Sequence, residues 1–401
     1  MKELAKVGST SILSWDPNLE AQALEQAKLL AELPFIHNRV CIMADGHSGY
    51  GVPIGGVFAT QDCILPYGAG NDIGCGVIVC RTNYCADDIK SQEVEDICGL
   101  VRKFIPMGNA AVHPERQFWQ GFEYLDSPYH TEYFTPSKRS WIEHSLGTLG
   151  SGNHFISLER SEDNNLYIMI HSGSRNLGAQ ICSLYTTLAQ QHAGQWYINL
   201  PHKDLAYLPA THQYGHHYLQ DMNFALRFAK ESRARMLDSV KNAVLRVLGR
   251  GRTPKGVVEP FSDAFDVHHN FISLEKHDGK HLYIHRKGAI HVPKGGIGVI
   301  PGSQGTASYI VEGLGSKVAF ESCSHGAGRR MGRKEATRTL NISEEAEKMS
   351  KIHFQGWLTS NGDVDLGEAP GAYKDIEQVM LNQTDLVQAV NRLLPMGVVK
   401  G

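Results

Sequence analysis

Apolar residues along the chain follow two patterns, helical spacing and short uninterrupted runs. The helical spacing predicts helices over 19–33, 93–104 and 218–248, and a further helix near 376–394. The short runs predict buried strands at 40–43, 77–79, 166–170 and 281–285. Residues 108–138 are aromatic and polar without a clear period, which favours a surface excursion. No low-complexity linker and no internal repeat divides these elements, so a single large domain over 1–401 is expected.

Composition limits the class of protein. With 401 residues, 42% of them hydrophobic and 20% charged, the chain has the profile of a soluble globular protein. Its eight cysteines form no CxxC pair, which argues against a disulfide framework or a zinc ribbon. The N-terminus lacks a secretory signal and no apolar run reaches membrane-spanning length, so we expect a cytoplasmic protein without a membrane partner.

The formal net charge of −3 excludes a polycation of the histone type, so a nucleic-acid partner would need a local basic patch. One candidate patch lies in the helical segment 217–256. Its charged side carries Arg227, Lys230, Arg233, Arg235, Lys241 and Arg246, followed by Arg250, Arg252 and Lys255. Most such runs are solvated helix faces, which is the favoured interpretation here. The alternative is a track for a phosphodiester backbone.

Glycine-rich loops hold an unusual number of metal-ligand residue types. Asp72 and Cys75 are three residues apart in one loop, and a carboxylate with a thiolate suits a borderline ion such as Mn, Zn or Fe. Three further loops contain His154, His171 and His269. Each residue alone is as well explained by a turn or a buried structural side chain. Together the five favour a metal centre, and two ions sharing the Cys75 thiolate would use all of them.

A second set of residues suggests phosphate chemistry. His325 precedes Gly326, Ala327 and Gly328, which would let a ligand approach backbone amides. Arg329 and Arg333 are four apart and would share a face if a helix begins here. The alternative interpretation is a helix N-terminus with a solvated basic face. A neutral imidazole beside a metal-bound nucleotide is a competent nucleophile when a carboxylate holds its other nitrogen, and Asp45 is the candidate.

Residues 295–309 are rich in small and hydroxyl side chains, which suits a nucleotide base and sugar, but they contain no Walker A motif. With this segment, eight motifs can be set side by side. They are Asp45-Gly-His-Ser-Gly-Tyr-Gly-Val-Pro-Ile-Gly-Gly, Asp72-Ile-Gly-Cys75-Gly, Gly152-Asn153-His154-Phe155, His171-Ser-Gly-Ser-Arg175, His268-His269-Asn270, Pro301-Gly-Ser-Gln-Gly-Thr-Ala-Ser308-Tyr309, Ser324-His325-Gly-Ala-Gly-Arg329 and Val399-Lys400-Gly401. In this order, over nearly the whole chain, they resemble the RtcB family of RNA ligases.

The resemblance implies a GTP- and Mn²⁺-dependent enzyme that joins RNA 3′-phosphate or 2′,3′-cyclic phosphate ends to 5′-hydroxyl ends. It implies an α+β fold, a single large domain with central β-sheets flanked by helices and the active site in a central cleft. His325 would take GMP and pass it to the RNA 3′-phosphate, and the 5′-hydroxyl would then displace GMP. The implied ligands of two Mn²⁺ ions are Asp72, Cys75, His154, His171 and His269. The implied nucleotide contacts are Asn153, Asn270, Arg329 and Arg333 for phosphate, with Ser303, Ser308, Tyr373 and Lys400 near the guanosine.

The chain departs from the family pattern at one place. Where the family usually has a Glu that helps hold guanine, this sequence has Ser157, with Glu159 two residues further on. Losing a carboxylate there would weaken recognition of the guanine N–H edge unless Glu159 takes its place, and the chain looks like a divergent member of the family. Neither tRNA as its substrate nor an activating protein partner follows from the sequence. Two competing interpretations are a two-metal phosphodiesterase or cyclic phosphatase, and a non-enzymatic RNA-binding or metal-storing protein.

Overall fold

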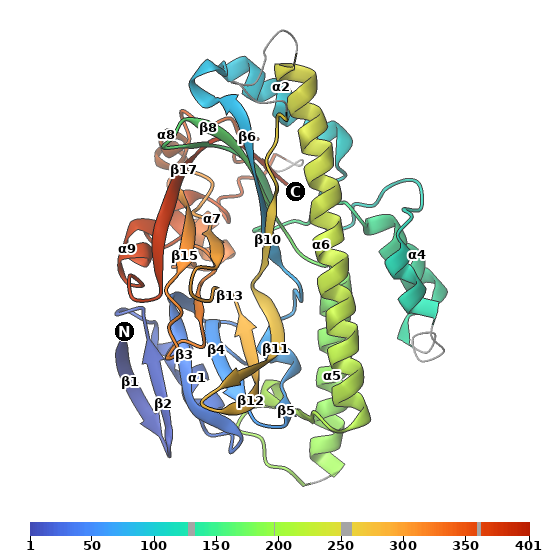
Figure 1. Ribbon diagram of the computed structural model, residues 1–401, viewed down its shortest axis with the longest axis vertical. Coiled ribbons are helices and arrows are strands. Elements are labelled where there is room, and N and C mark those ends of the chain that lie inside the picture. Colours follow the sequence, from blue (N-terminus) through green and yellow to red (C-terminus); the bar gives the residue numbers. More distant parts are fainter. Residues whose placement is uncertain (127–132, 196, 250–258, 359–361) are drawn as a thin grey trace.

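The computed structural model describes residues 1–126, 133–195, 197–249, 259–358 and 362–401. Its helices are α1 (Ala21–Ala31), α2 (Ser91–Phe104), α4 (Pro136–Ser145), α5 (Asn176–Gln195), α6 (Gln213–Leu248), α7 (Arg333–Thr339), α8 (Ile342–Lys348) and α9 (Ile376–Leu381). They flank two large β-sheets (Figure 1), so the α+β prediction is confirmed. No helix in the described ranges is long and apolar enough to cross a membrane.

The two sheets differ in their strand order. The first has the order β1-β2-β3-β4-β12-β11, built from β1 (Lys2–Val7), β2 (Thr10–Ser14), β3 (Ile36–His47), β4 (Ile54–Thr60), β12 (Lys280–Lys287) and β11 (Asn270–His277). The second has the order β10-β6-β8-β7-β17-β15-β14, built from β10 (Phe265–His268), β6 (Gly76–Cys85), β8 (Asn165–Ser172), β7 (Phe155–Ser161), β17 (Val387–Lys400), β15 (Ser308–Gly313) and β14 (Ile297–Ile300). Two short pairs complete the strands, β13 (Ala289–His291) with β16 (Ser322–Ser324) and β5 (Cys63–Ile64) with β9 (Leu208–Pro209).

Helix α6 is the longest element and runs lengthwise past both sheets (Figure 1). Its apolar side chains Val240 and Val244 share one core with Ile156 of β7 and Ile168 of β8. Nearer its start, Phe224 and Phe228 belong to a second core that includes residues of α5. Because the helix closes two cores, it fixes the strands and loops of the second sheet against each other.

Most elements predicted from apolar patterns are present, with longer bounds for the strands. One prediction is wrong: the helix expected near 376–394 ends at Leu381, and Val387–Lys400 forms strand β17. This strand pairs with β15 on one side and β7 on the other, so backbone partners distant in sequence override the local spacing. Asp45, expected in a loop, lies inside β3.

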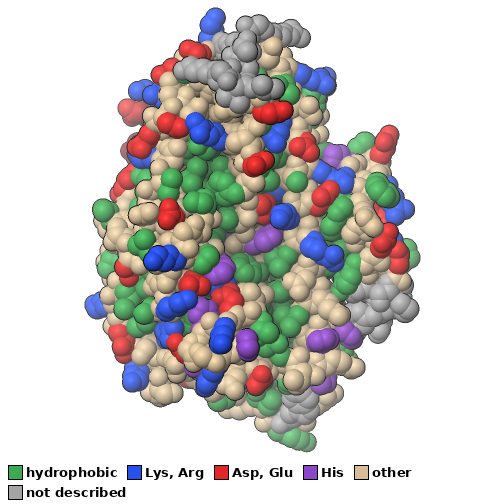
Figure 2. All heavy atoms as spheres, viewed as in Figure 1, with side chains coloured by type: hydrophobic (Ala, Val, Ile, Leu, Met, Phe, Trp, Pro, Cys, Tyr) green, Lys and Arg blue, Asp and Glu red, His purple; other side chains and the backbone are tan. Residues whose placement is uncertain are grey.

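The predicted basic face of the 217–256 segment is only partly a surface. Arg233 is fully buried, and its guanidinium contacts the loop before β6, the end of β8 and strand β10. Arg235 is paired with Glu231 at 2.8 Å. Figure 2 shows acidic and basic side chains intermixed on the face that includes α6, rather than one continuous basic stripe. Residues 250–258, with three of the predicted cations, lie outside the described residues.

The segment 321–334 does not begin a helix at His325 as one interpretation required. Residues 322–324 form β16, His325 to Gly332 are irregular, and α7 begins at Arg333. Gly328 explains part of this path, since its φ is +72° and a Cβ there would lie 2.3 Å from the carbonyl oxygen of Asp45. Arg329 and Arg333 therefore do not share a helix face, although both reach the same carboxylate, as described below.

Candidate active site

The five predicted metal ligands converge from four segments of the chain, each at or next to an end of a strand of the second sheet. Asp72 and Cys75 precede β6, His154 precedes β7, His171 lies near the end of β8, and His269 lies between β10 and β11. Their ligand atoms form two groups, each within 4.8 Å: Cys75, His171 and His269, and Asp72, Cys75 and His154. The Cys75 thiol belongs to both groups. This arrangement matches the predicted two-ion centre, whose metal content stays a prediction.

The chemistry of these donors fits a transition metal. Burial lowers the pKa of His171 and of His269 well below the usual value, so both imidazoles are neutral and free to bind a cation. Burial and the Asp72 carboxylate raise the pKa of the Cys75 thiol, which means that a thiolate here needs a positive charge beside it. The Nδ1 atom of His269 is buried without a hydrogen-bond partner among the described residues. Mixed S, N and O donors suit Mn, Zn or Fe better than Mg or Ca.

Arg233 of α6 connects the loops that carry these ligands. Its Nη1 donates to the carbonyl oxygens of Gly74 at 2.9 Å and Ser172 at 2.6 Å, the neighbours of Cys75 and His171. Its Nε and Nη2 bind the Asp266 carboxylate, both at 2.7 Å. Gly74 has a φ of +79°, and a Cβ there would lie 3.1 Å from a backbone oxygen of α6. One buried guanidinium thus holds the loop before β6, the end of β8 and strand β10 together.

His325 faces this cluster with a carboxylate behind it. Its Nδ1 lies 2.6 Å from Oδ2 of Asp45, and its backbone N–H donates to the same oxygen at 3.1 Å. Burial alone would raise the pKa of Asp45, but the charges of His325, His47 and Lys374 hold it below its usual value, so the carboxylate stays ionised. The ring centroids of His325 and His269 are 4.7 Å apart. The imidazole is therefore held by Nδ1, which leaves Nε2 as its available nitrogen.

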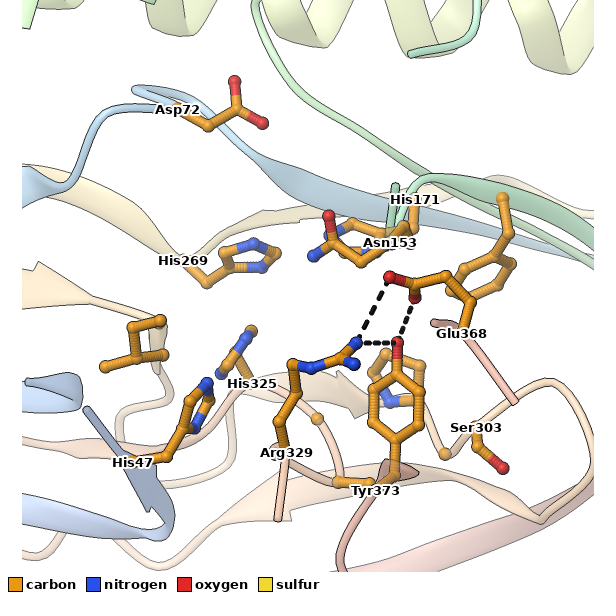
Figure 3. A pocket seen from close by; sticks show the side chains of 18 of the residues that line it. His47, Asp72, Asn153, His171, His269, Ser303, His325, Arg329, Glu368 and Tyr373 are labelled. Atoms are coloured by element: carbon orange, nitrogen blue, oxygen red, sulfur yellow. Dashed lines mark hydrogen bonds and ion pairs between the residues drawn. The ribbon is translucent and has the colours of Figure 1, made fainter. Parts of the chain in front are cut away.

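A cavity of about 450 Å³ lies between His325 and the metal-ligand cluster. All the residues predicted to contact the nucleotide line it: Asn153, Asn270, Ser303, Ser308, Gly326, Ala327, Gly328, Arg329, Arg333, Tyr373 and Lys400. In Figure 3, Asp72 and His269 lie on one side of this space and His325, Arg329 and Tyr373 on the other. Cys75, His154 and Asp45 are not among the lining residues and lie behind these walls.

Glu368 is a lining residue that the sequence did not single out. Its carboxylate accepts from Arg329 at 3.2 Å and from the Tyr373 hydroxyl (Figure 3). It also accepts from Arg333 at 2.6 Å and from Lys400 at 3.2 Å. Although burial opposes it, the charges of Lys400 and Arg333 lower the pKa of Glu368 to about 2. One carboxylate thus aligns three cations whose combined charge exceeds its own. In the sequence, the only feature that could have drawn attention to Glu368 is its position five residues before Tyr373.

Lys287 and His47 are two further lining residues missed from the sequence. The Lys287 ammonium is buried and donates to the carbonyl oxygens of Tyr50 at 2.6 Å and Val52 at 2.7 Å. Burial lowers its pKa to about 8. Burial also lowers the pKa of His47 to about 4, so this ring is neutral beside His325 (Figure 3). In the sequence, Lys287 could have been noticed only as a Lys near the end of a predicted strand, and His47 only as a His two residues after Asp45.

Ser157 and Glu159 point to the same side of β7 and both line the cavity. The Ser157 hydroxyl donates to Oε1 of Glu159 at 2.7 Å, and the Ser308 hydroxyl reaches the same oxygen at 3.4 Å. The other oxygen, Oε2, has no hydrogen-bond partner among the described residues. Burial raises the pKa of Glu159 to about 7. The Glu159 carboxyl therefore lines the cavity on the same side of β7 as Ser157, two residues along from the position where the resemblance noted a lost carboxylate.

Comparison with known proteins decides the family. The family model described as tRNA-splicing ligase RtcB matches residues 26–401, which include every residue of the site. The chain belongs to the RtcB family. It is 33% identical to the RNA-splicing ligase RtcB of Escherichia coli K12, over 100% of this chain and 99% of that protein. It is also 31% identical to the tRNA-splicing ligase RtcB of Pyrobaculum aerophilum, over 94% of this chain and 91% of that protein. These bacterial and archaeal relatives thus match the chain over nearly its whole length.

Proposed function

We propose that this protein is an RNA ligase that joins 3′-phosphate or 2′,3′-cyclic phosphate ends to 5′-hydroxyl ends, using GTP and Mn²⁺. The observation that carries the proposal is the position of His325, with Nδ1 against Asp45 and its ring in one cavity with the predicted metal ligands. The names of the RtcB relatives support RNA joining as the reaction. A hydrolase would need the metal ligands but not a buried carboxylate that holds a histidine for nucleophilic attack.

In the first step, Nε2 of His325 forms a bond to the α-phosphorus of GTP. The bond from that phosphorus to the bridging oxygen breaks, and pyrophosphate leaves with the electron pair. Asp45 keeps the proton on Nδ1 and stabilises the charge that develops on the ring. Arg329 and Arg333 line the same cavity with guanidinium groups that suit phosphate oxygens.

In the second step, an oxygen of the RNA 3′-phosphate attacks the phosphorus held by His325. The phosphorus–nitrogen bond breaks and its electron pair returns to Nε2. Before this step, water opens a cyclic end: its oxygen bonds to the phosphorus and the bond to the 2′-oxygen breaks, which leaves a 3′-phosphate and a 2′-hydroxyl. Asp72, Cys75, His154, His171 and His269 would hold two Mn²⁺ ions, which when bound supply positive charge for phosphate oxygens.

For the base, we infer that Glu159 takes the role of the carboxylate missing at Ser157. An ionised carboxylate accepts from the N–H edge of guanine, whereas adenine offers no matching pair of donors. Ser303, Ser308, Tyr373 and Lys400 complete the guanosine side of the cavity. Because the pKa of Glu159 is about 7, the preference for GTP over ATP should strengthen as the pH rises through neutrality.

The decisive experiment is detection of a covalent adduct. The protein is incubated with α-labelled GTP and Mn²⁺, denatured, and assayed for retained label. We expect label on the wild type, none on His325→Ala, and much less on Asp45→Asn. Release of 3′-phosphate from RNA ends without any adduct would instead favour the hydrolase. In a parallel assay, joined product from 3′-phosphate and 5′-hydroxyl oligonucleotides should depend on both GTP and Mn²⁺.

A further inference from the structure

The cavity between His325 and the metal-ligand cluster is lined by four histidines among the described residues. His171 and His269 are predicted metal ligands, and His325 is the proposed nucleophile. The fourth is His47, whose ring lies beside that of His325 in Figure 3. The proposed steps leave this imidazole without a role. A neutral imidazole that faces a phosphate site is suited to proton transfer.

Asp45 fixes both imidazoles of this wall, but through different groups. Its carboxylate lies 2.6 Å from Nδ1 of His325, whereas its backbone carbonyl oxygen lies 2.9 Å from Nδ1 of His47. A carbonyl oxygen only accepts, so Nδ1 of His47 carries the hydrogen and Nε2 keeps its lone pair. The bond to Asp45 is the one hydrogen bond that the His47 side chain makes with the described residues. Nε2 of His47 is therefore free to accept a proton.

The two anchors suit different chemistry. The Asp45 carboxylate stabilises the positive charge that develops on His325 when its Nε2 bonds to phosphorus. A carbonyl oxygen is neutral and supports a charged ring less, and burial lowers the pKa of His47 to about 4. The His47 ring is thus unprotonated at neutral pH. An anionic phosphate bound beside it would favour the charged form and so help the ring to take up a proton.

The other acid and base groups that line the cavity are engaged. Asp72 is a predicted metal ligand, and Glu368 is paired with three cations. Glu159 is assigned to the guanine base. Once His325 carries GMP, its Nε2 is bonded to phosphorus and has no lone pair to share. Among the described lining residues, His47 is then the imidazole that can still accept a proton.

Two events of the proposed reaction release a proton from the attacking oxygen: the opening of a cyclic end by water and the final attack of the 5′-hydroxyl. In the final attack, the incoming and leaving oxygens lie on opposite sides of the 3′-phosphorus. GMP lies against the wall that holds His325, so the 5′-hydroxyl arrives from the side away from His47. The opening of the cyclic end is therefore the step that His47 can serve.

We propose that His47 is the proton acceptor for the water that opens a 2′,3′-cyclic phosphate end. This inference rests on the proposed function. The water oxygen bonds to the phosphorus while one of its protons passes to Nε2 of His47. The bond from phosphorus to the 2′-oxygen breaks with its electron pair, and that oxygen takes a proton from solvent. His47 then releases its proton to solvent, which leaves a 3′-phosphate and a 2′-hydroxyl.

A pair of oligonucleotides that differ only at the 3′ end tests this step. One ends in a 2′,3′-cyclic phosphate and the other in a 3′-phosphate. The full chain is given Mn²⁺, GTP and a separate 5′-hydroxyl strand, and the joining rates on the two ends are compared. Opening is also followed without the 5′-hydroxyl strand, by mass spectrometry of the RNA end, where opened ends carry one added water or a guanylate.

His47→Gln removes the proton acceptor and keeps a polar side chain. It should lower the joining rate on cyclic ends, relative to that on 3′-phosphate ends, by about 100-fold, the lower end of what a positioned proton acceptor contributes. His281→Gln is the matched control, because His281 is exposed on β12 and does not line the cavity. It should keep the wild-type ratio.

His47→Ala leaves a space that a free imidazole can enter. Imidazole added to the buffer should restore the opening of cyclic ends in this variant without changing its joining of 3′-phosphate ends. A purely structural role predicts equal losses on both ends and no selective rescue.

Equal losses on the two ends in His47→Gln would overturn the proposal, because His47 would then serve His325 or the final attack. Wild-type opening of cyclic ends in both variants would overturn it as well. A wild type that opened cyclic ends without forming a GMP adduct would count against the ligase function. The opening assay, which follows the cyclic end itself, would still decide the role of His47.

Discussion

The cavity between His325 and the metal-ligand cluster has two walls that are built in opposite ways. The metal-ligand wall is largely buried, its His171 and His269 are neutral, and Arg233 fixes it from behind. The opposite wall, here called the nucleotide wall, carries the cations Arg329, Arg333 and Lys400, which Glu368 aligns. It is partly open, and the Arg333 side chain is 55% exposed. Rigid donors suit ions that stay bound through many turnovers. In the nucleotide wall, the cations can release the Glu368 carboxylate and bind a phosphate instead, which suits a substrate that must enter and leave. Variants in each wall should therefore fail in different ways.

The largest effect is expected for Cys75→Ala, which removes the donor common to both three-ligand groups. Metal content should fall, and RNA joining should fall by more than about 100-fold, because loss of an outer partner alone costs about 10–100-fold. The fold should remain, since a small buried side chain is replaced by a smaller one. Mass spectrometry of bound metal and circular dichroism separate these outcomes.

Cys63→Ala is the matched control, because Cys63 is half-buried on β5 and belongs to neither group. It should keep wild-type metal content and activity. If Cys75→Ala kept its full metal content and its joining activity, the two ions would not share the Cys75 thiolate. The metal-ligand wall would then depend less on fixed donors than we propose.

Arg233→Ala tests whether the metal-ligand wall depends on its anchor. Removing one partner of a buried ion pair costs about 3–5 kcal/mol, and Asp266 would be left unpaired. We expect lower stability in urea and loss of metal. Arg233→Lys keeps the charge but not the fork of donors, so it should hold metal weakly with a smaller loss of stability.

Lys230→Ala, three residues earlier on the exposed side of α6, is the control and should change stability by less than about 0.5 kcal/mol. If Lys230→Ala weakened RNA binding more than Arg233→Ala weakened metal binding, the backbone-track interpretation of this helix would gain support.

Glu159→Gln tests the nucleotide wall through the pH dependence of the free energy of unfolding. Folding raises the pKa of this carboxyl from 4.5 to about 7, so the folded state holds its proton more tightly than the unfolded state. The resulting stability is present below pH 4.5 and is lost as the pH rises through about 7. The free energy of unfolding of Glu159→Gln relative to wild type should therefore grow by up to about 3 kcal/mol between pH 4.5 and 8.

Urea denaturation at several pH values measures this difference. Glu162→Gln, on the exposed turn after β7, should show a difference from wild type that does not change with pH. A flat profile for Glu159→Gln would mean that this carboxyl is ionised throughout and plays no pH-dependent part in base selection.

The two walls also differ in how far the sequence predicts them. The metal ligands stand in short glycine loops, so their residue types and motifs are visible without a fold. Glu368 binds Lys400, which is 32 positions away in the sequence, and Arg233 binds Ser172 and Gly74, which are 61 and 159 positions away. No local pattern marks a carboxylate as the centre of three cations. Strand β17 shows the same limit. Apolar residues at 387, 390, 393 and 394 fit a helix or a strand, and only pairing with β7, which sets Lys400 opposite Phe155, decides between them.

Arg333→Ala should have the smallest effect and separates nucleotide binding from RNA binding. Its guanidinium is half-exposed, so its loss should raise the GTP concentration for half-maximal adduct formation by about tenfold, near the lower end for a charged hydrogen bond. RNA binding should change less. Lys334→Ala, the exposed neighbour on α7 that does not line the cavity, is the control for general loss of positive charge. If Arg333→Ala weakened RNA binding more than adduct formation, and Lys334→Ala did the same, this end of the wall would belong to the RNA rather than to the nucleotide. Glu368 would then align its cations for a polymer that passes over the cavity, not for a triphosphate inside it.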